Sequence, residues 1–147
     1  MAGRGRCSSA ALVVLAVLLG AGCTSIQVTP VPRLEVPPQV CIEENPKVIV
    51  ADFLPVVRDG FSRHGILTEV VAAPAPERCE YVLTYTALQS WDFATYLSVA
   101  QLTLTRRGQT VATADYHLIG KGGFSLMKWQ GTKTKMDPVL DQLLQNY

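Results

Sequence analysis

The sequence has little charge and almost no excess of either sign. Charged residues make up 17% of its 147 residues, and 13 basic side chains stand against 12 acidic ones, for a formal net charge of +1. Proteins that bind nucleic-acid backbones carry a clear basic excess, because phosphate contacts supply much of the affinity. The composition therefore argues against a nucleic-acid partner, and the length suits a single folded domain.

The sequence also lacks an apolar run long enough to span a membrane. The N-terminal apolar stretch, 10–20, has eleven residues. At about 1.5 Å per helical residue it would reach roughly 17 Å, whereas the hydrocarbon core of a bilayer is about 30 Å thick. Arg4 and Arg6 precede this stretch, and the small residues 20–22 follow it. This order is typical of a secretory signal, so we predict that residues 1–22 are removed after export.

The end of the predicted signal carries a cysteine in a specific context. Residues 19–23 read LGAGC and resemble the lipobox of bacterial lipoproteins, although the leucine usual three places before the cysteine is Gly20 here. The resemblance implies that Cys23 receives a diacylglyceryl group and becomes the acylated mature N-terminus. Because Thr24 rather than Asp follows it, the resemblance also implies the periplasmic face of the outer membrane. An ordinary signal peptide with an incidental cysteine is the alternative.

Cysteine is scarce in the mature chain. Apart from Cys23, only Cys41 and Cys79 remain once the signal is removed. The periplasm is oxidising, so we predict a disulfide between them. A zinc site made from these two residues with His64 and His117 is the alternative, but the ligands lack the close C-x-x-C or H-x-x-x-H pairing of such sites. We expect no metal and no cofactor.

Prolines divide the mature chain into two parts. Pro30, Pro32, Pro37 and Pro38 lie close together near its start. Proline lacks a backbone donor and favours extended polyproline geometry. We predict a proline-rich tether over 23–39 and a single periplasmic domain over 40–147. Packing of 34–40 as an edge segment of the fold is the alternative.

The residue pattern of the domain predicts two helices among several strands. Apolar residues at three-four spacing predict a helix over 52–63 and another that begins at Asp137 or nearer Thr132. A hairpin turn is predicted at 106–109. Strands are predicted over 39–43, 66–71, 80–89, 97–105 and 110–119, with a short edge strand within 124–129. We expect an α+β fold, an α/β two-layer sandwich of order β-α-β-β-β-β-α, with two helices on one face of a mainly antiparallel sheet of four to five strands.

Four segments of the domain resemble a small uncharacterised family of proteobacterial lipoproteins. They read CIEENP at 41–46, DGFSRHGI at 59–66, CEYVLTYTALQSWD at 79–92 and GKGGFSLMKWQGTK at 120–133. The resemblance implies a lipoprotein with one periplasmic α/β domain and brings no known activity with it. More loosely, the element order is similar to periplasmic modules that assist envelope assembly.

No stretch of the sequence carries a complete catalytic motif. Ser125 lies in GFSLM, which lacks the second glycine of G-x-S-x-G. The glycines of 120–123 do not form a P-loop and predict a turn or bulge. Asp115 and His117 share one strand face, which fits either a surface contact or an oriented imidazole. We expect a protein that is not an enzyme.

A basic edge near the C-terminus is the candidate binding feature. Residues 116–136 contain four lysines and no acidic residue. We single out Lys121, Lys128, Trp129 and Lys133 as a candidate contact for lipid headgroups, lipopolysaccharide phosphates or peptidoglycan carboxylates. A solvated lysine-bearing edge that blocks strand association is the alternative.

A second aromatic segment lies at 90–97. It reads SWDFATYL and places Trp91, Phe93 and Tyr96 near a strand connection. Core packing or a plug under a loop is one interpretation, and a protein-binding hot spot is the other.

These features favour a non-enzymatic lipoprotein anchored in the outer membrane by its N-terminal lipid. It would act through contacts with envelope proteins, peptidoglycan or lipopolysaccharide. The alternative is a periplasmic binding module for a small anionic ligand or an envelope polymer.

Overall fold

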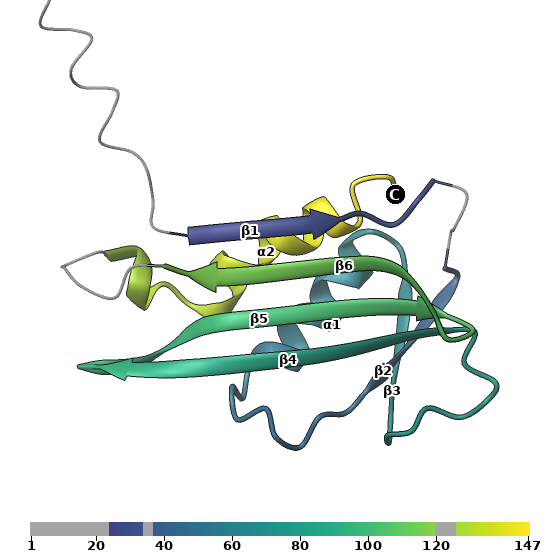
Figure 1. The fold of residues 1–147 in the computed structure, drawn as a ribbon, viewed down its shortest axis with the longest axis horizontal. Helices are drawn as coiled ribbons and strands as arrows, with labels where there is room; N and C mark the ends of the chain where they lie inside the picture. Colours follow the sequence, from purple (N-terminus) through teal and green to yellow (C-terminus); the bar gives the residue numbers. More distant parts are fainter. Residues whose placement is uncertain (1–23, 34–36, 120–125) are drawn as a thin grey trace, which may run out of the picture.

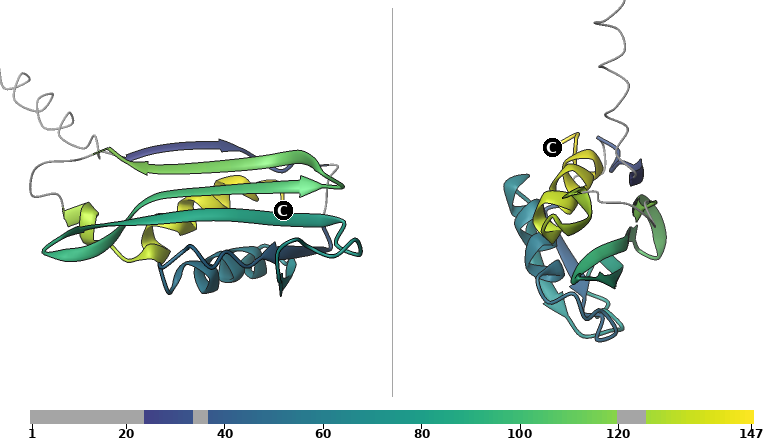
Figure 2. Two further views of the ribbon diagram at one scale, coloured as in Figure 1. Left: turned by 60° about the horizontal axis from the view of Figure 1, so that its bottom comes forward. Right: turned by 90° about the vertical axis from the view of Figure 1, so that its left-hand side faces the viewer.

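The computed structural model describes residues 24–33, 37–119 and 126–147. The elements are β1 (Thr24–Thr29), β2 (Gln39–Glu43), α1 (Phe53–Arg63), β3 (Leu67–Val71), β4 (Tyr81–Asp92), β5 (Ala94–Arg106), β6 (Gln109–Leu118), the 3-10 helix η2 (Leu126–Trp129) and α2 (Thr132–Leu143). Six strands form one sheet in the order β1-β6-β5-β4-β2-β3, and α1 and α2 cover one of its faces (Figures 1 and 2). The α+β class with two helices on one face is confirmed.

The sheet is larger than predicted and mixed in direction. β4, β5, β6 and β1 pair antiparallel, whereas β2 runs parallel to both β3 and β4. The prediction of a mainly antiparallel sheet of four to five strands is therefore wrong in strand number and in the direction of one edge. The physical reason is the connection between β2 and β3, which passes through α1. A crossover helix returns the chain to the starting end of the sheet, so the second strand must run parallel to the first.

The predicted tether is wrong over the first part of its range, because this segment belongs to the sheet. β1 pairs with β6 from Thr24 opposite Leu118 to Thr29 opposite Thr113. Val31 is fully buried, and its backbone N–H donates to the Leu143 carbonyl at 2.9 Å. The neighbouring prolines are tolerated because they follow the strand, where no ladder donor is needed. Cys23 and residues 34–36 lie outside the described residues.

The helix α1 follows its sequence pattern closely. Phe53, Val57 and Phe61 are fully buried against the sheet, as their three-four spacing predicts. The helix gives way at His64 to Gly65, whose φ of +74° is the left-handed conformation that suits glycine after a helix. The carboxylate of Asp52 does not cap the helix but accepts a hydrogen bond from the Thr132 hydroxyl at 2.8 Å, which ties the starts of α1 and α2 together.

The C-terminal region departs from one strand prediction. α2 begins at Thr132, the earlier of the two predicted starts, with Pro138 inside it. The predicted edge strand within 124–129 is wrong over Leu126–Trp129, which form η2; the preceding two residues lie outside the described part of the chain. β1 occupies the free side of β6 that such a strand would need. Within the described residues, no helix is long and apolar enough to cross a bilayer.

Candidate functional site

Cys41 and Cys79 form a disulfide, which confirms the prediction. The bond joins strand β2 to the loop before β4, with 5.9 Å between the two Cα atoms. Because both sulfurs are used, the predicted zinc alternative loses its thiolate ligands. Across 24–33, 37–119 and 126–147, no three His, Cys, Asp or Glu side chains gather in a way that could hold a metal ion.

The residues of the predicted basic edge are separated by the fold. Lys128, in η2, is buried and forms an ion pair with Asp92 at the end of β4. Lys133, in α2, forms ion pairs with Asp59 of α1 and with Asp137, the latter at 3.2 Å. Lys121 lies outside the described residues. The two described lysines thus belong to different clusters, and carboxylates already balance the charge of each.

Trp129 and Lys135 form hydrogen bonds with the backbone of the β4–β5 hairpin close to the Lys128–Asp92 ion pair. The Trp129 indole N–H donates to the backbone carbonyl of Asp92 at 3.0 Å. Lys135 is buried, and its ammonium donates to the carbonyls of Leu97 at 3.0 Å and Lys128 at 2.7 Å. Burial lowers the pKa of Lys135 below its ordinary value of 10.5. The sequence did contain a signal for this burial, since Lys135 lies four residues before the buried Val139.

The aromatic segment at 90–97 forms the tip of the β4–β5 hairpin, and its two outermost rings face solvent. Trp91 is 75% exposed and Phe93 is 84% exposed, so core packing is wrong for both. Of the three aromatic residues, Tyr96 packs against the core, as does the adjacent Leu97. Phe93 connects the paired residues Asp92 and Ala94 with a φ of +59°, a conformation uncommon for an aromatic residue. An exposed apolar tip of this kind is characteristic of a contact surface.

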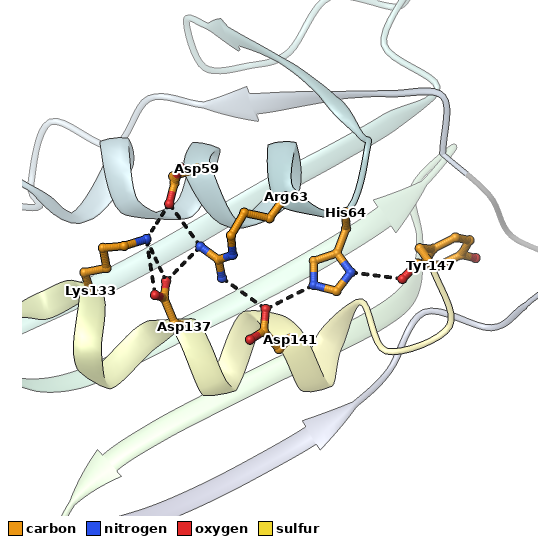
Figure 3. Close-up of polar contacts among 7 residues, drawn as sticks. All are labelled: Asp59, Arg63, His64, Lys133, Asp137, Asp141 and Tyr147. Carbon is orange, nitrogen blue, oxygen red and sulfur yellow. Dashed lines mark hydrogen bonds and ion pairs between the residues drawn. The ribbon is translucent and has the colours of Figure 1, made fainter.

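A polar network joins the two helices on the side away from the sheet (Figure 3). Arg63 donates to Asp59 and Asp137 at 3.0 Å through Nη1, and to Asp141 at 3.0 Å through Nη2. His64 places Nε2 at 3.0 Å from Asp141 and Nδ1 at 3.1 Å from the Tyr147 main-chain oxygen. Each carboxylate is engaged by a cation, so the network clamps α1 to α2 and offers no free nucleophile.

The network depresses the pKa of two carboxylates. The hydrogen bond from His64, helped by Arg63, lowers the pKa of Asp141 below 3.8, and the hydrogen bond from Lys133 lowers that of Asp59. A depressed folded-state pKa stabilises the fold fully above pH 3.8, and the stabilisation is lost as the pH falls through the lower folded value.

Replacing Asp141 with Asn should therefore have a small and pH-dependent effect. Because the Asp141 carboxylate is half-exposed and water screens its contacts with Arg63 and His64, we expect the free energy of unfolding at pH 7 to fall by about 0.5 kcal/mol. The difference from the wild type should vanish towards pH 2, as measured by urea denaturation across the pH range. Gln142→Ala, at an exposed neighbouring position, is the control and should show no such pH dependence. An undiminished difference at pH 2 would contradict the electrostatic origin.

The sheet face opposite the helices is polar and uncovered. Ser25, Gln27, Gln101, Asp115 and His117 line a hollow of about 430 Å³ on this face. Asp115 accepts a hydrogen bond from Gln101 Nε2 at 2.9 Å, and Ser25 lies opposite His117 in the β1–β6 register. In the part of the chain that the structure describes, no hydrogen bond links His117 to Asp115 or to Ser25.

The geometry defines a two-layer α+β domain with a mixed sheet, one open polar face and an aromatic hairpin tip. No family model and no curated protein matches the sequence. Among solved structures, the fold is similar to that of the PelC dodecamer from Paraburkholderia phytofirmans, with a TM-score of 0.53, 14% identity, and coverage of 80% of this chain and 97% of that one. A substituted form of the same dodecamer gives a TM-score of 0.50 with the same identity and coverage. At this identity the likeness establishes the fold alone.

Proposed function

We propose that the chain is a lipoprotein of the outer membrane, held by an acylated Cys23, which displays one α+β domain in the periplasm and acts by contact. The lipobox-like stretch ending at Cys23 is the observation that carries this proposal. The Cys41–Cys79 disulfide supports it, because such bonds persist in oxidising compartments such as the periplasm.

The uncovered sheet face is the contact surface that best fits this role. It combines the hollow around Gln101 and Asp115 with exposed threonines of β4, such as Thr84 and Thr86. Hydroxyl and amide groups of this kind recognise another polar surface through hydrogen bonds. We infer a partner among envelope proteins, peptidoglycan or lipopolysaccharide, and no catalytic role.

The anchor is tested by the native N-terminus and by the residue that follows it. Mass spectrometry of the protein from membranes should show a chain that begins at residue 23 and carries thioether-linked diacylglycerol. Because aspartate after the acylated cysteine is the alternative sorting signal, we expect Thr24→Asp to move the protein to the inner-membrane fraction of a density gradient. Thr24→Ser is the control and should stay in the outer membrane. A native chain without fatty acid at residue 23 would overturn the proposal.

Self-association is a second candidate role, favoured by the structural neighbour. PelC, whose fold this domain shares, forms a dodecamer. Here β1 and β3 are the edge strands of the sheet, which are the elements that can pair with another copy. Light scattering of the acylated protein in detergent should then give a mass many times that of one chain, whereas a monomer would exclude assembly.

The alternative of a small anionic ligand depends on cations that are already paired. Lys133 is exposed, but Asp59 and Asp137 lie against its ammonium. A phosphate-like ligand would have to displace these carboxylates. Calorimetric titration with inorganic phosphate tests this role. Heat of binding would support a small anionic ligand, whereas a protein that acts by contact with an envelope polymer should give none.

A further inference from the structure

The hairpin tip and the attachment point of the chain lie at the same end of the sheet. In Figure 1 and in the left-hand view of Figure 2, the start of β1, the end of β6 and the β4–β5 tip lie at the same end of the sheet. The strand registers agree, because Thr24 lies opposite Leu118, the neighbouring His117 lies opposite Val99, and Val99 lies opposite Leu88. Leu88 is therefore level with Ser25, and the residues of β4 after Gln89 project beyond the start of β1.

The projecting part of the hairpin is long enough to reach a membrane that holds the anchor. Ser90 to Asp92 add three residues beyond the level of Thr24, or roughly 10 Å at the rise of an extended strand. Cys23 immediately precedes Thr24, which is already paired in the sheet, so no free tether separates them. The polar headgroup region on each side of a bilayer is about 5 to 8 Å thick. A chain anchored at Cys23 thus brings the tip to the bilayer surface.

The side chains at this end are the kind that a bilayer interface favours. Trp91 and Phe93 are exposed at the tip, and Leu88 and Ile119 are exposed beside it. Tryptophan concentrates at the boundary between headgroups and hydrocarbon, and tryptophan, phenylalanine and leucine form the membrane-facing side of interfacial segments. The left-handed backbone of Phe93 would suit Gly or Asn better, so an aromatic ring there is not explained by the turn itself. Leu67, the exposed apolar residue at the opposite end, has no aromatic neighbour in its strand.

Polar contacts hold the tip in place and leave it without net charge. Asp92 forms an ion pair with Lys128, so the tip's one acidic group is balanced. The Asp92 carbonyl also accepts the Trp129 indole N–H, which fixes the turn that holds Phe93. A balanced, preorganised loop loses little solvation and little conformational freedom when it enters an interface.

From these observations we propose that the β4–β5 tip is a second membrane contact, with Trp91 and Phe93 inserted among the lipid headgroups beside the Cys23 anchor. The inference rests on the proposed function, because the anchor supplies the position of the bilayer. Two contacts at one end of the sheet fix the strands at a steep angle to the membrane. The polar sheet face then lies roughly perpendicular to the membrane plane and is exposed to the periplasm.

The test places the acylated protein in phospholipid vesicles and measures quenching of tryptophan fluorescence by lipids brominated near the headgroup end of their chains. The chain has two tryptophans, so the Trp91→Phe variant allows the signal of Trp91 to be obtained by difference. We expect brominated lipid to reduce Trp91 emission at least twofold relative to the same lipid without bromine. The matched control is Leu67→Trp in the Trp91→Phe background, which puts an exposed indole at the far end and should not be quenched.

The outcomes distinguish the membrane contact of the tip from the lipoprotein proposal on which it rests. Mass spectrometry of the same sample shows whether Cys23 is acylated. An acylated protein whose Trp91 is not quenched overturns the membrane contact and leaves the lipoprotein proposal standing. An unacylated native protein overturns both. If Trp91 is shielded from acrylamide by an envelope protein and not by vesicles, the tip is a protein-binding surface and the membrane contact is wrong.

Discussion

Replacing both Cys41 and Cys79 with alanine is expected to lower the free energy of unfolding by about 4 kcal/mol. The disulfide closes a chain segment with a sequence separation of 38 residues, and the chain-entropy model gives this magnitude for a loop of that length. The bond also fastens the strand β2, which carries the parallel part of the sheet, to the loop that leads into β4. The double variant should be compared with the oxidised wild type by urea denaturation.

The reduced wild type is the control for this prediction. Treatment with a thiol reductant removes the bond without changing any side chain, and it should give a loss similar to that of the double alanine variant. If both changes cost less than about 1 kcal/mol, the bond contributes little to the fold. In that case the disulfide would serve mainly to report the redox state of the compartment.

Gly60→Val should destabilise the domain by about 3 kcal/mol. A Cβ atom at Gly60 would lie 2.5 Å from Leu140 Cδ1, 3.1 Å from its Cβ and 3.2 Å from its Cγ. Both positions are buried where α1 crosses α2, so the branched side chain can enter only by pushing the helices apart. Overpacking of this kind usually costs about 1–3 kcal/mol, and three close contacts place this site at the upper end.

Two further variants make the steric explanation testable. Ser62→Val changes an exposed position of the same helix and should alter the free energy of unfolding by less than about 0.5 kcal/mol. Leu140→Ala should itself be costly, but combined with Gly60→Val it makes room for the valine. The double variant should therefore lose at least about 1 kcal/mol less than the sum of the single losses. Simple additivity would contradict the clash.

Local pattern was sufficient to predict most of the elements. The helix predicted over 52–63 is α1 (Phe53–Arg63), and the strand predicted over 39–43 is β2. Both depend on spacing and turn residues within a single window, which is what sequence periodicity reports. The disulfide was also predictable, because a predicted oxidising compartment and the predicted fates of Cys7 and Cys23 left one pairing.

Pairings between distant segments could not be predicted in the same way. β1 was missed because its partner lies 84 to 94 residues further along, as Thr29 opposite Thr113 and Thr24 opposite Leu118 show. The prolines that follow β1 also have the composition of a linker. The basic edge was mistaken for one patch for a similar reason, since Asp92, which pairs with Lys128, and Asp59, which pairs with Lys133, come from β4 and α1. A linear charge pattern does not show which carboxylates the fold brings alongside.

The pairing of β1 with β6 alone has a consequence for how the protein is made. A chain that leaves the export machinery N-terminus first presents residues 23 and 24 long before residues 113–118 have emerged. If Cys23 is the acylated N-terminus proposed above, the stretch that must be cleaved and acylated is therefore still unpaired during translocation. The Val31 carbonyl also cannot be satisfied until the C-terminal turn has emerged, because Asn146 donates a hydrogen bond to it at 2.7 Å. We expect maturation of the N-terminus to precede closure of the sheet, with β1 docking as the last step.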